Sequence, residues 1–186
     1  MEKMINGARR QKPCLSRRHC FSLFLLVSGI VVLLIGWGTV PSEAKKMKIG
    51  WVERVRVFPG NLLMMAKIDT GADNSSIHAT SIESFKKNDE QWVRFTVTPI
   101  QGDPKVIERP IFRLTQITRH GAPDEDRLVV KMGICLGPVY KEDMEVNLAD
   151  RSNFEYKMLI GRSFLRGEAM VDPSKEFTQE PQCFPE

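Results

Sequence analysis

The feature that most constrains the fold is an alternating stretch followed at once by a turn and a second apolar run. Along residues 92–99, apolar and polar side chains alternate, as in a strand with one buried face. A turn cluster occupies residues 101–104, and residues 105–114 then return antiparallel to the first strand. The sequence therefore predicts a long β-hairpin over residues 92–114.

Further short apolar runs separated by turn residues extend the β prediction along the chain. We expect strands at residues 46–57, 62–68, 127–136, 139–148, 158–160 and 169–172. Short helices are predicted only at residues 79–87 and 163–166, and the polar stretch 119–126 is predicted to be a loop. Closely spaced strands with little helix indicate an all-β domain.

The first 44 residues differ in character from the rest. Residues 1–20 carry six basic side chains, and residues 21–40 then contain no charge. This order is typical of a secretory signal or of a membrane anchor. Small residues at Ser42 and Ala44 favour cleavage after Ala44, with a retained inner-membrane anchor as the alternative. In both cases we expect export, to the periplasm if the source is a Gram-negative cell.

Charge gives no support to nucleic-acid binding. The leader holds six of the 27 basic and two of the 23 acidic residues, so the formal charge of +4 belongs to it alone. The remainder is balanced and shows no basic patch for a polyanion. It is long enough for one domain with a buried core. We expect this domain at residues 45–173 and a polar tail, frayed or lying on the surface, at residues 174–186.

Two of the four cysteines fall outside the leader. Cys135 and Cys183 could form a disulfide in an oxidising compartment. Cys135 also fits the core of a strand, so the sequence leaves this pairing open.

The motif Asp69-Thr70-Gly71 follows an apolar run and indicates carboxylate chemistry. A protease that activates water directly needs a base and an acid, and two neighbouring carboxyls that share one proton supply both. The Thr70 hydroxyl can hold the loop, and Gly71 lets backbone and substrate approach closely. The same three residues are also ordinary turn formers, so the motif needs support from elsewhere in the chain.

Two stretches together supply that support, because they resemble the two signatures of the retropepsin family of aspartic proteases. Residues 66–73 are similar to its catalytic motif, and residues 158–165 are similar to its second signature of apolar residues, Gly, Arg and a short apolar helix. The resemblance covers about residues 46–173. It implies a single-lobe β-barrel with one or two short helices and a flap hairpin, which we place at residues 92–114.

The resemblance also implies a role for each matched residue. Asp69 would be the catalytic carboxylate. Gly161 would lie beneath the catalytic loop, and Arg162 would pair with Asp73 through a forked guanidinium–carboxylate bond. Asp73 would also help to hold the substrate backbone. The positions that would support catalysis and bind substrate are Thr70, Gly71, Ala72, Asp73, Gly161 and Arg162.

One lobe carries one Asp-Thr-Gly, so a complete carboxylate pair requires a homodimer with Asp69 from each subunit. The chain is accordingly expected to be an exported aspartic endopeptidase that acts on protein or peptide substrates. The alternative is a retropepsin-like module that binds a peptide or a cell-wall partner without turnover.

A closer resemblance is to a bacterial group labelled ATP-dependent zinc proteases and associated with RimK-type ligases. It rests on residues 49–53, 67–72, 92–95 and 150–151. The chain contains neither a His-Glu-x-x-His helix nor a Gly-Lys-Ser/Thr phosphate loop, and His78, His120 and Cys135 lack metal-ligand spacing. We therefore expect no metal and no cofactor.

Overall fold

The computed structural model describes residues 45–119 and 121–184. The expected leader, with its predicted membrane contact at residues 21–40, lies outside the described residues. Within the described ranges, no helix is long and apolar enough to cross a membrane. The elements are β1 (Met47–Phe58), β2 (Leu62–Ile68), β3 (Ser75–His78), β4 (Thr80–Lys87), β5 (Glu90–Val97), β6 (Lys105–Arg119), β7 (Ala122–Leu136), β8 (Val139–Ala149), β9 (Met158–Ile160), α2 (Arg162–Leu165) and β10 (Ala169–Glu176).

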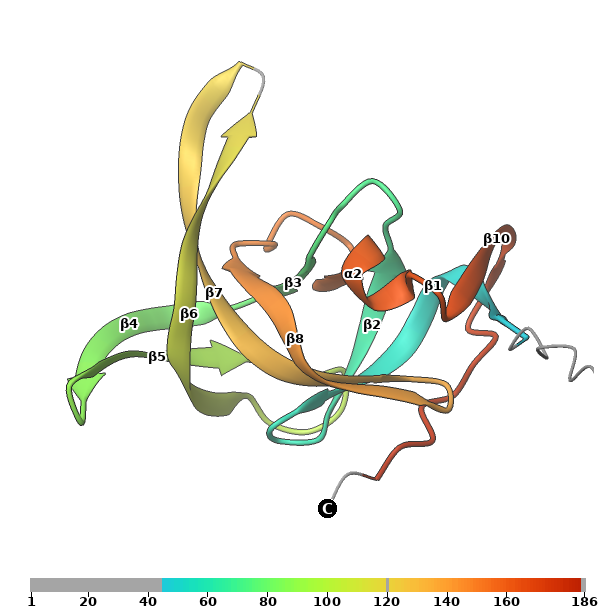
Figure 1. Cartoon of the computed structure of the whole chain (residues 1–186), viewed down its shortest axis with the longest axis horizontal. Coiled ribbons are helices and arrows are strands. Elements are labelled where there is room, and N and C mark those ends of the chain that lie inside the picture. The colour runs from blue at the N-terminus through green and yellow to red at the C-terminus, as the bar shows by residue number, and fades with distance from the viewer. Residues whose placement is uncertain (1–44, 120, 185–186) are drawn as a thin grey trace, which may run out of the picture. The chain divides into compact units, whose positions relative to one another are not determined.

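Six strands close into a barrel, which confirms the expected all-β, retropepsin-like fold. Their order is β1-β2-β9-β3-β8-β7, and β7 returns to β1 through pairs such as Val57 with Ile134. Outside the ring, β10 lies parallel to β1, while β6, β5 and β4 continue from β7 (Figure 1). Closure leaves no free edge among these six strands, whereas β10 and β4 remain the two end strands of the sheet.

Alternating side chains fill the barrel. In β2, the residues Leu62, Met64, Ala66 and Ile68 are buried, while the residues between them are more exposed. Because successive side chains of a strand point to opposite faces, every second residue of each strand packs into one shared apolar cluster. Because β2 and β9 both end inside this cluster, the loops that follow them are held on a rigid base.

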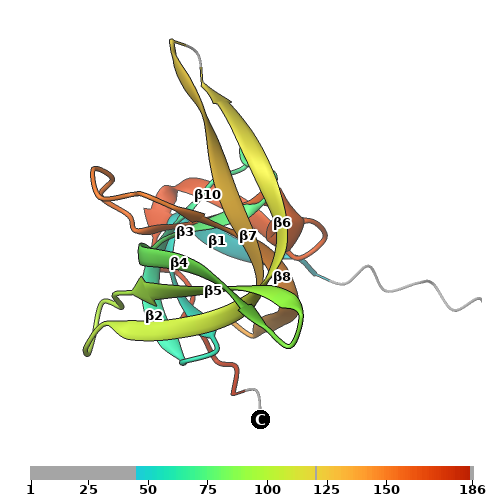
Figure 2. The ribbon, with the colours of Figure 1, turned by 90° about the vertical axis from the view of Figure 1, so that its left-hand side faces the viewer.

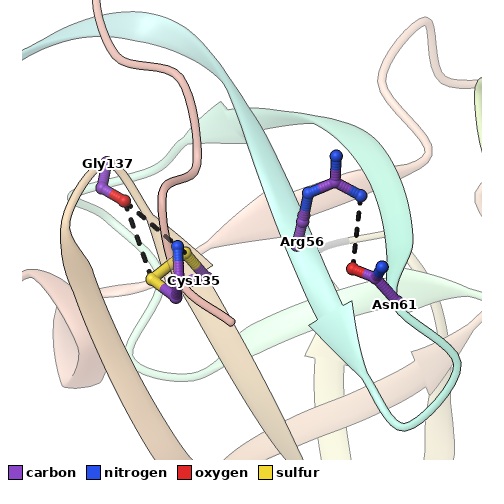
Figure 3. The surroundings of a disulfide bond; sticks show 5 residues. Arg56, Asn61, Cys135 and Gly137 are labelled. Carbon is purple, nitrogen blue, oxygen red and sulfur yellow. Dashed lines mark hydrogen bonds between the residues drawn. A yellow bond between two sulfur atoms is a disulfide. The ribbon is translucent and has the colours of Figure 1, made fainter. Parts of the chain in front are cut away.

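The tail after β10 is fastened to the barrel. The buried Glu53 carboxylate accepts hydrogen bonds from the backbone of Gly50, Thr178 and Gln179. A disulfide then joins Cys135 to Cys183, next to Gly137 in the turn between β7 and β8 (Figure 3). The tail therefore lies on the surface and is held there by a disulfide. The pairing of Cys135 with Cys183, which the sequence left open, is present.

The helix predicted over residues 79–87 is wrong, because this segment is strand β4. It pairs with β5 through a hairpin whose two turn residues, Asn88 and Asp89, have φ of 51° and 64°. Such positive values are typical of two-residue hairpin turns. Nearly all of β4 is exposed, so no apolar face was available to stabilise a helix.

The loop predicted over residues 119–126 is also wrong. There β6 and β7 pair almost to their ends, with Thr115 opposite Arg127 and Ile117 opposite Glu125. In Figure 1 this hairpin rises above the barrel on the same side as the loop that joins β2 to β3, and Figure 2 shows the same arrangement. Residues 122–126, Ala-Pro-Asp-Glu-Asp, are mostly polar, so this segment lacks the alternation that marks a half-buried strand.

The predicted hairpin at residues 92–114 exists as β5 and β6, but its placement as the flap is wrong. Its turn is held by a bond from the Ile100 amide to the Leu63 carbonyl at 2.9 Å. Leu63 lies six residues before Asp69 on β2, about 20 Å away along an extended strand. The hairpin on the Asp69 side of the barrel is β6–β7.

Candidate active site

Asp69 stands at the end of β2 with its main chain and side chain both fixed. Its amide donates to the carbonyl of Ile160 at 2.9 Å. Its carboxylate oxygen Oδ1 accepts the amides of Gly71 at 2.9 Å and Ala72 at 3.2 Å. The loop therefore turns around the carboxylate and orients it, while the residue stays partly open to solvent.

The second signature packs directly against this loop. A Cβ atom added to Gly161 would lie 2.6 Å from the carbonyl carbon and oxygen of Asn74 and 2.7 Å from the Asp73 oxygen. Only a glycine allows this approach of two backbones. The amides of Arg162 and Ser163 then donate to the carbonyls of Ala72 and Asp73, each at 2.9 Å. Gly161 thus lies against the loop, as the resemblance implied.

Arg162 braces the loop mainly through its carbonyls. Its Nη1 donates to the carbonyl oxygens of Thr70 at 3.0 Å and Gly71 at 2.8 Å. The expected partner Asp73 is reached by Nη2 at only 3.4 Å, and its side chain is 68% exposed. The pair with Asp73 forms, but as a single long contact and not as a fork, so it adds little stability.

The hydroxyl that supports the loop belongs to Ser75 and not, as the sequence suggested, to Thr70. The side chain of Thr70 is exposed, and among the described residues no hydrogen bond of its hydroxyl is found. The buried Ser75 hydroxyl instead accepts the amide of Gly161 at 3.2 Å. The interior hydroxyl therefore supports the loop, and that of Thr70 faces outward.

A cleft opens between the β6–β7 hairpin and the loop that follows β8. Its lining residues are Glu125, Arg127, Asp150, Arg151, Asn153 and Phe154. Arg127 forms a forked bond with Glu125 at 2.9 and 3.0 Å. Arg151 is only 7% exposed, donates from Nε to the Tyr156 carbonyl, and lies over the ring of Phe154.

The electrostatics connect this cleft with Asp69. Burial lowers the pKa of Arg151, the neighbouring charge of Arg127 lowers it further, and the Asp69 carboxylate opposes both effects. Burial likewise lowers the pKa of Arg127. Both guanidinium groups stay charged at any working pH, so the cleft presents cationic side chains within electrostatic reach of Asp69.

Sequence reasoning found no role for Arg127 or Arg151. Asp150 and Arg151 contributed to the resemblance, yet nothing local marks either as part of a cleft. Their position depends on the β6–β7 hairpin, which the sequence analysis missed. Of the metal-ligand candidates, Cys135 is committed to a disulfide, and His78 accepts the Arg151 amide at Nδ1, while His120 lies outside the described residues. No group of three metal-ligating side chains occurs in the described ranges.

Comparison with known proteins identifies the family to which this chain belongs. The model of the RimB-like family, described as retropepsin-like aspartic endopeptidase RimB, matches residues 48–182. A structure of a protein of unknown function from Legionella pneumophila superposes with a TM-score of 0.62 and 31% identity. The match covers 73% of this chain and all of that one.

Curated relatives carry a similar segment within longer chains. A "probable alpha-L-glutamate ligase" from Shewanella halifaxensis is 36% identical over 115 residues, which are 60% of this chain and 25% of that protein. One of the same name from Desulfotalea psychrophila is 31% identical over 112 residues, 59% and 24% of the two chains. This chain therefore spans about a quarter of the curated relatives it matches. Because the family model covers most of the chain, the protein belongs to the RimB-like family of retropepsin-like proteins.

Proposed function

We propose that this protein is an exported aspartic endopeptidase whose active site forms when two copies bring their Asp69 carboxylates together. The observation that carries the proposal is the oriented carboxylate, held by two loop amides at the end of a buried strand. Two such carboxyls in contact share one proton. One then removes a proton from the attacking water, while the other protonates the peptide carbonyl oxygen.

The surface beside the catalytic loop supports pairing with a second copy. A concave region is lined by Thr70, Arg162, Leu165, Arg166, Gly167, Ala169 and Val171. It is continuous with β10, which ends the sheet order and carries the half-exposed Met170. A two-fold axis here would place both Asp69 loops, with their outward Thr70 hydroxyls, against each other.

The cleft between the hairpin and the loop after β8 is the proposed substrate channel. Arg151 makes no ion pair within the described residues, and the nearby Asp69 carboxylate opposes the lowering of its pKa by burial. A buried guanidinium favours a carboxylate ligand. We therefore propose that the substrate carries acidic side chains, which agrees with the glutamate named in the curated relatives. In this scheme, Asp73 holds the substrate backbone.

Export is the proposed location of the mature domain. The disulfide between Cys135 and Cys183 is of the kind that persists in oxidising compartments. Fusion of residues 1–44 to a reporter that folds only after export should yield active reporter. A reporter that stays in the cytoplasm would overturn this part of the proposal.

Cleavage and mass measured together test the function. The domain is incubated with acidic and neutral unfolded peptides, beside an Asp69→Asn variant, and its mass is determined by sedimentation at the same concentration. We expect a dimer, cleavage of the acidic peptides and none by the variant. Equal cleavage by both proteins would refute the role of Asp69. Peptide binding without cleavage would favour the non-catalytic module.

A further inference from the structure

Glu145 on β8 joins two parts of the molecule that are distant in sequence. Its Oε2 accepts Nε and Nη2 of Arg113, at 3.0 and 2.7 Å. The same oxygen accepts the side-chain amide of Asn74 at 3.3 Å. One carboxylate oxygen thus receives donors from the β6–β7 hairpin and from the catalytic loop.

The strand register explains how Arg113 reaches Glu145. Arg113 lies opposite Val129 on β7, and Val129 lies opposite Asn147 on β8. The side chain therefore crosses over β7, across two strand spacings or about 10 Å. It starts just after Pro110, where β6 leaves β5 and begins to pair with β7. The contact is thus made at the base of the projecting hairpin.

Asn74 transmits this contact to the catalytic loop. Its carbonyl group lies against Gly161, where an added Cβ would stand at 2.6 Å, so its backbone has little freedom to move independently. It directly follows Asp73 and precedes Ser75, whose hydroxyl holds Gly161. A displacement of Asn74 is therefore passed to the turn around Asp69.

We propose that Glu145 is a positioning residue that couples the β6–β7 hairpin to the catalytic loop. It does not touch the reacting atoms. Through Arg113 and Asn74, it fixes the position of the hairpin base relative to the loop that carries Asp69. The hairpin and the Asp69 carboxylate therefore keep the same relative position when a peptide binds. The catalytic consequence rests on the proposed function, whereas the mechanical coupling does not.

Hydrogen exchange of the full domain tests the coupling from both ends. In Arg113→Ala the altered side chain belongs to the hairpin, and we expect exchange in the catalytic segment, residues 69–77, to accelerate by about threefold to tenfold. In Asn74→Ala the altered side chain belongs to the loop, and we expect a similar acceleration in hairpin residues 111–117 and 124–130. Glu145→Gln should accelerate both segments.

The chain provides a matched control pair between β5 and β6. Arg94 donates from Nε and Nη2 to Oε1 of Glu108, at 2.9 and 2.7 Å, with exposure close to that of the Arg113 pair. This pair does not contact the catalytic loop. Glu108→Gln should therefore leave exchange in residues 69–77 unchanged.

Acceleration confined to the segment that carries each substitution would overturn the proposal. So would equal effects of Glu145→Gln and Glu108→Gln on residues 69–77. If the wild type cleaves no peptide, the proposed function fails, but these exchange patterns still decide the coupling. If it does cleave, Glu145→Gln should lower kcat about threefold to tenfold, and Glu108→Gln should not.

Discussion

Replacement of Gly161 by alanine provides a sharp structural test of the site. The new methyl group would meet backbone atoms of Asn74 at 2.6 Å and of Asp73 at 2.7 Å. Ordinary contact begins at 3.4 Å, so the two backbones must separate by about 0.8 Å. No flexible side chain is present at this contact to absorb the change.

The magnitude follows from the cost of overpacking. Forcing a methyl group into a close-packed site costs about 1–3 kcal/mol, which corresponds to a loss of roughly 3–9 °C in Tm for a domain of this size. The separation also draws the turn around Asp69 away from its partners. A shift of this order can lower catalysis about 100-fold, so activity should fall more than stability does.

The assay is thermal denaturation beside peptide cleavage, with Ser163→Ala as the control. The Ser163 hydroxyl is buried and has no hydrogen-bond partner among the described residues, so its removal should be neutral or slightly stabilising. A Gly161→Ala protein with unchanged Tm and unchanged cleavage would refute the tight backbone contact on which our description of the site depends.

Three further predictions concern the brace, the disulfide and acid stability. Arg162→Lys should lower kcat about tenfold with little change in Tm, because an ammonium cannot span the carbonyls that the half-exposed guanidinium joins. A fall in Tm large enough to account for the loss of kcat would contradict this prediction. Reduction of the bond between Cys135 and Cys183, 48 residues apart, should cost up to about 4 kcal/mol of unfolding free energy, measured by urea denaturation with Cys183→Ser as a reductant-insensitive control. The pKa of Asp150 is lowered from 3.8, chiefly by the Ser152 amide, so its stabilisation is present above that value and is lost as pH falls through the folded pKa. Asp150→Asn should thus lower Tm at pH 6, and the difference from wild type should shrink towards pH 3; a constant difference would exclude this titration.

The parts predicted well are those in which local sequence and burial agree. The apolar runs that became β2 and β9 each end at a functional loop, so Asp69 and Gly161 could be placed from sequence. The residues that contact each other at the site lie within a few positions of the ends of these two runs. A resemblance carried by these two stretches therefore predicted the central geometry.

The parts missed depend on pairing between polar segments. The end of the β6–β7 hairpin at residues 122–126 is mostly polar, and β4 is almost fully exposed, so neither carries the alternation by which strands are recognised. The Asn88-Asp89 turn was the local signal for β4. Arg151 acquires its burial and its electrostatic contact with Asp69 only through long-range packing, which no local pattern reports. The flap was consequently predicted at residues 92–114, whereas the hairpin on the Asp69 side of the barrel is β6–β7 (Figure 1).

The central claim, that two Asp69 carboxylates form one active site, is tested most directly by mixing wild-type and Asp69→Asn subunits at constant total concentration. After exchange of subunits, a site that needs both carboxylates predicts activity proportional to the square of the wild-type fraction, or about a quarter in an equal mixture. Activity of about one half, linear in the wild-type fraction, would show that each chain acts alone and would contradict the account.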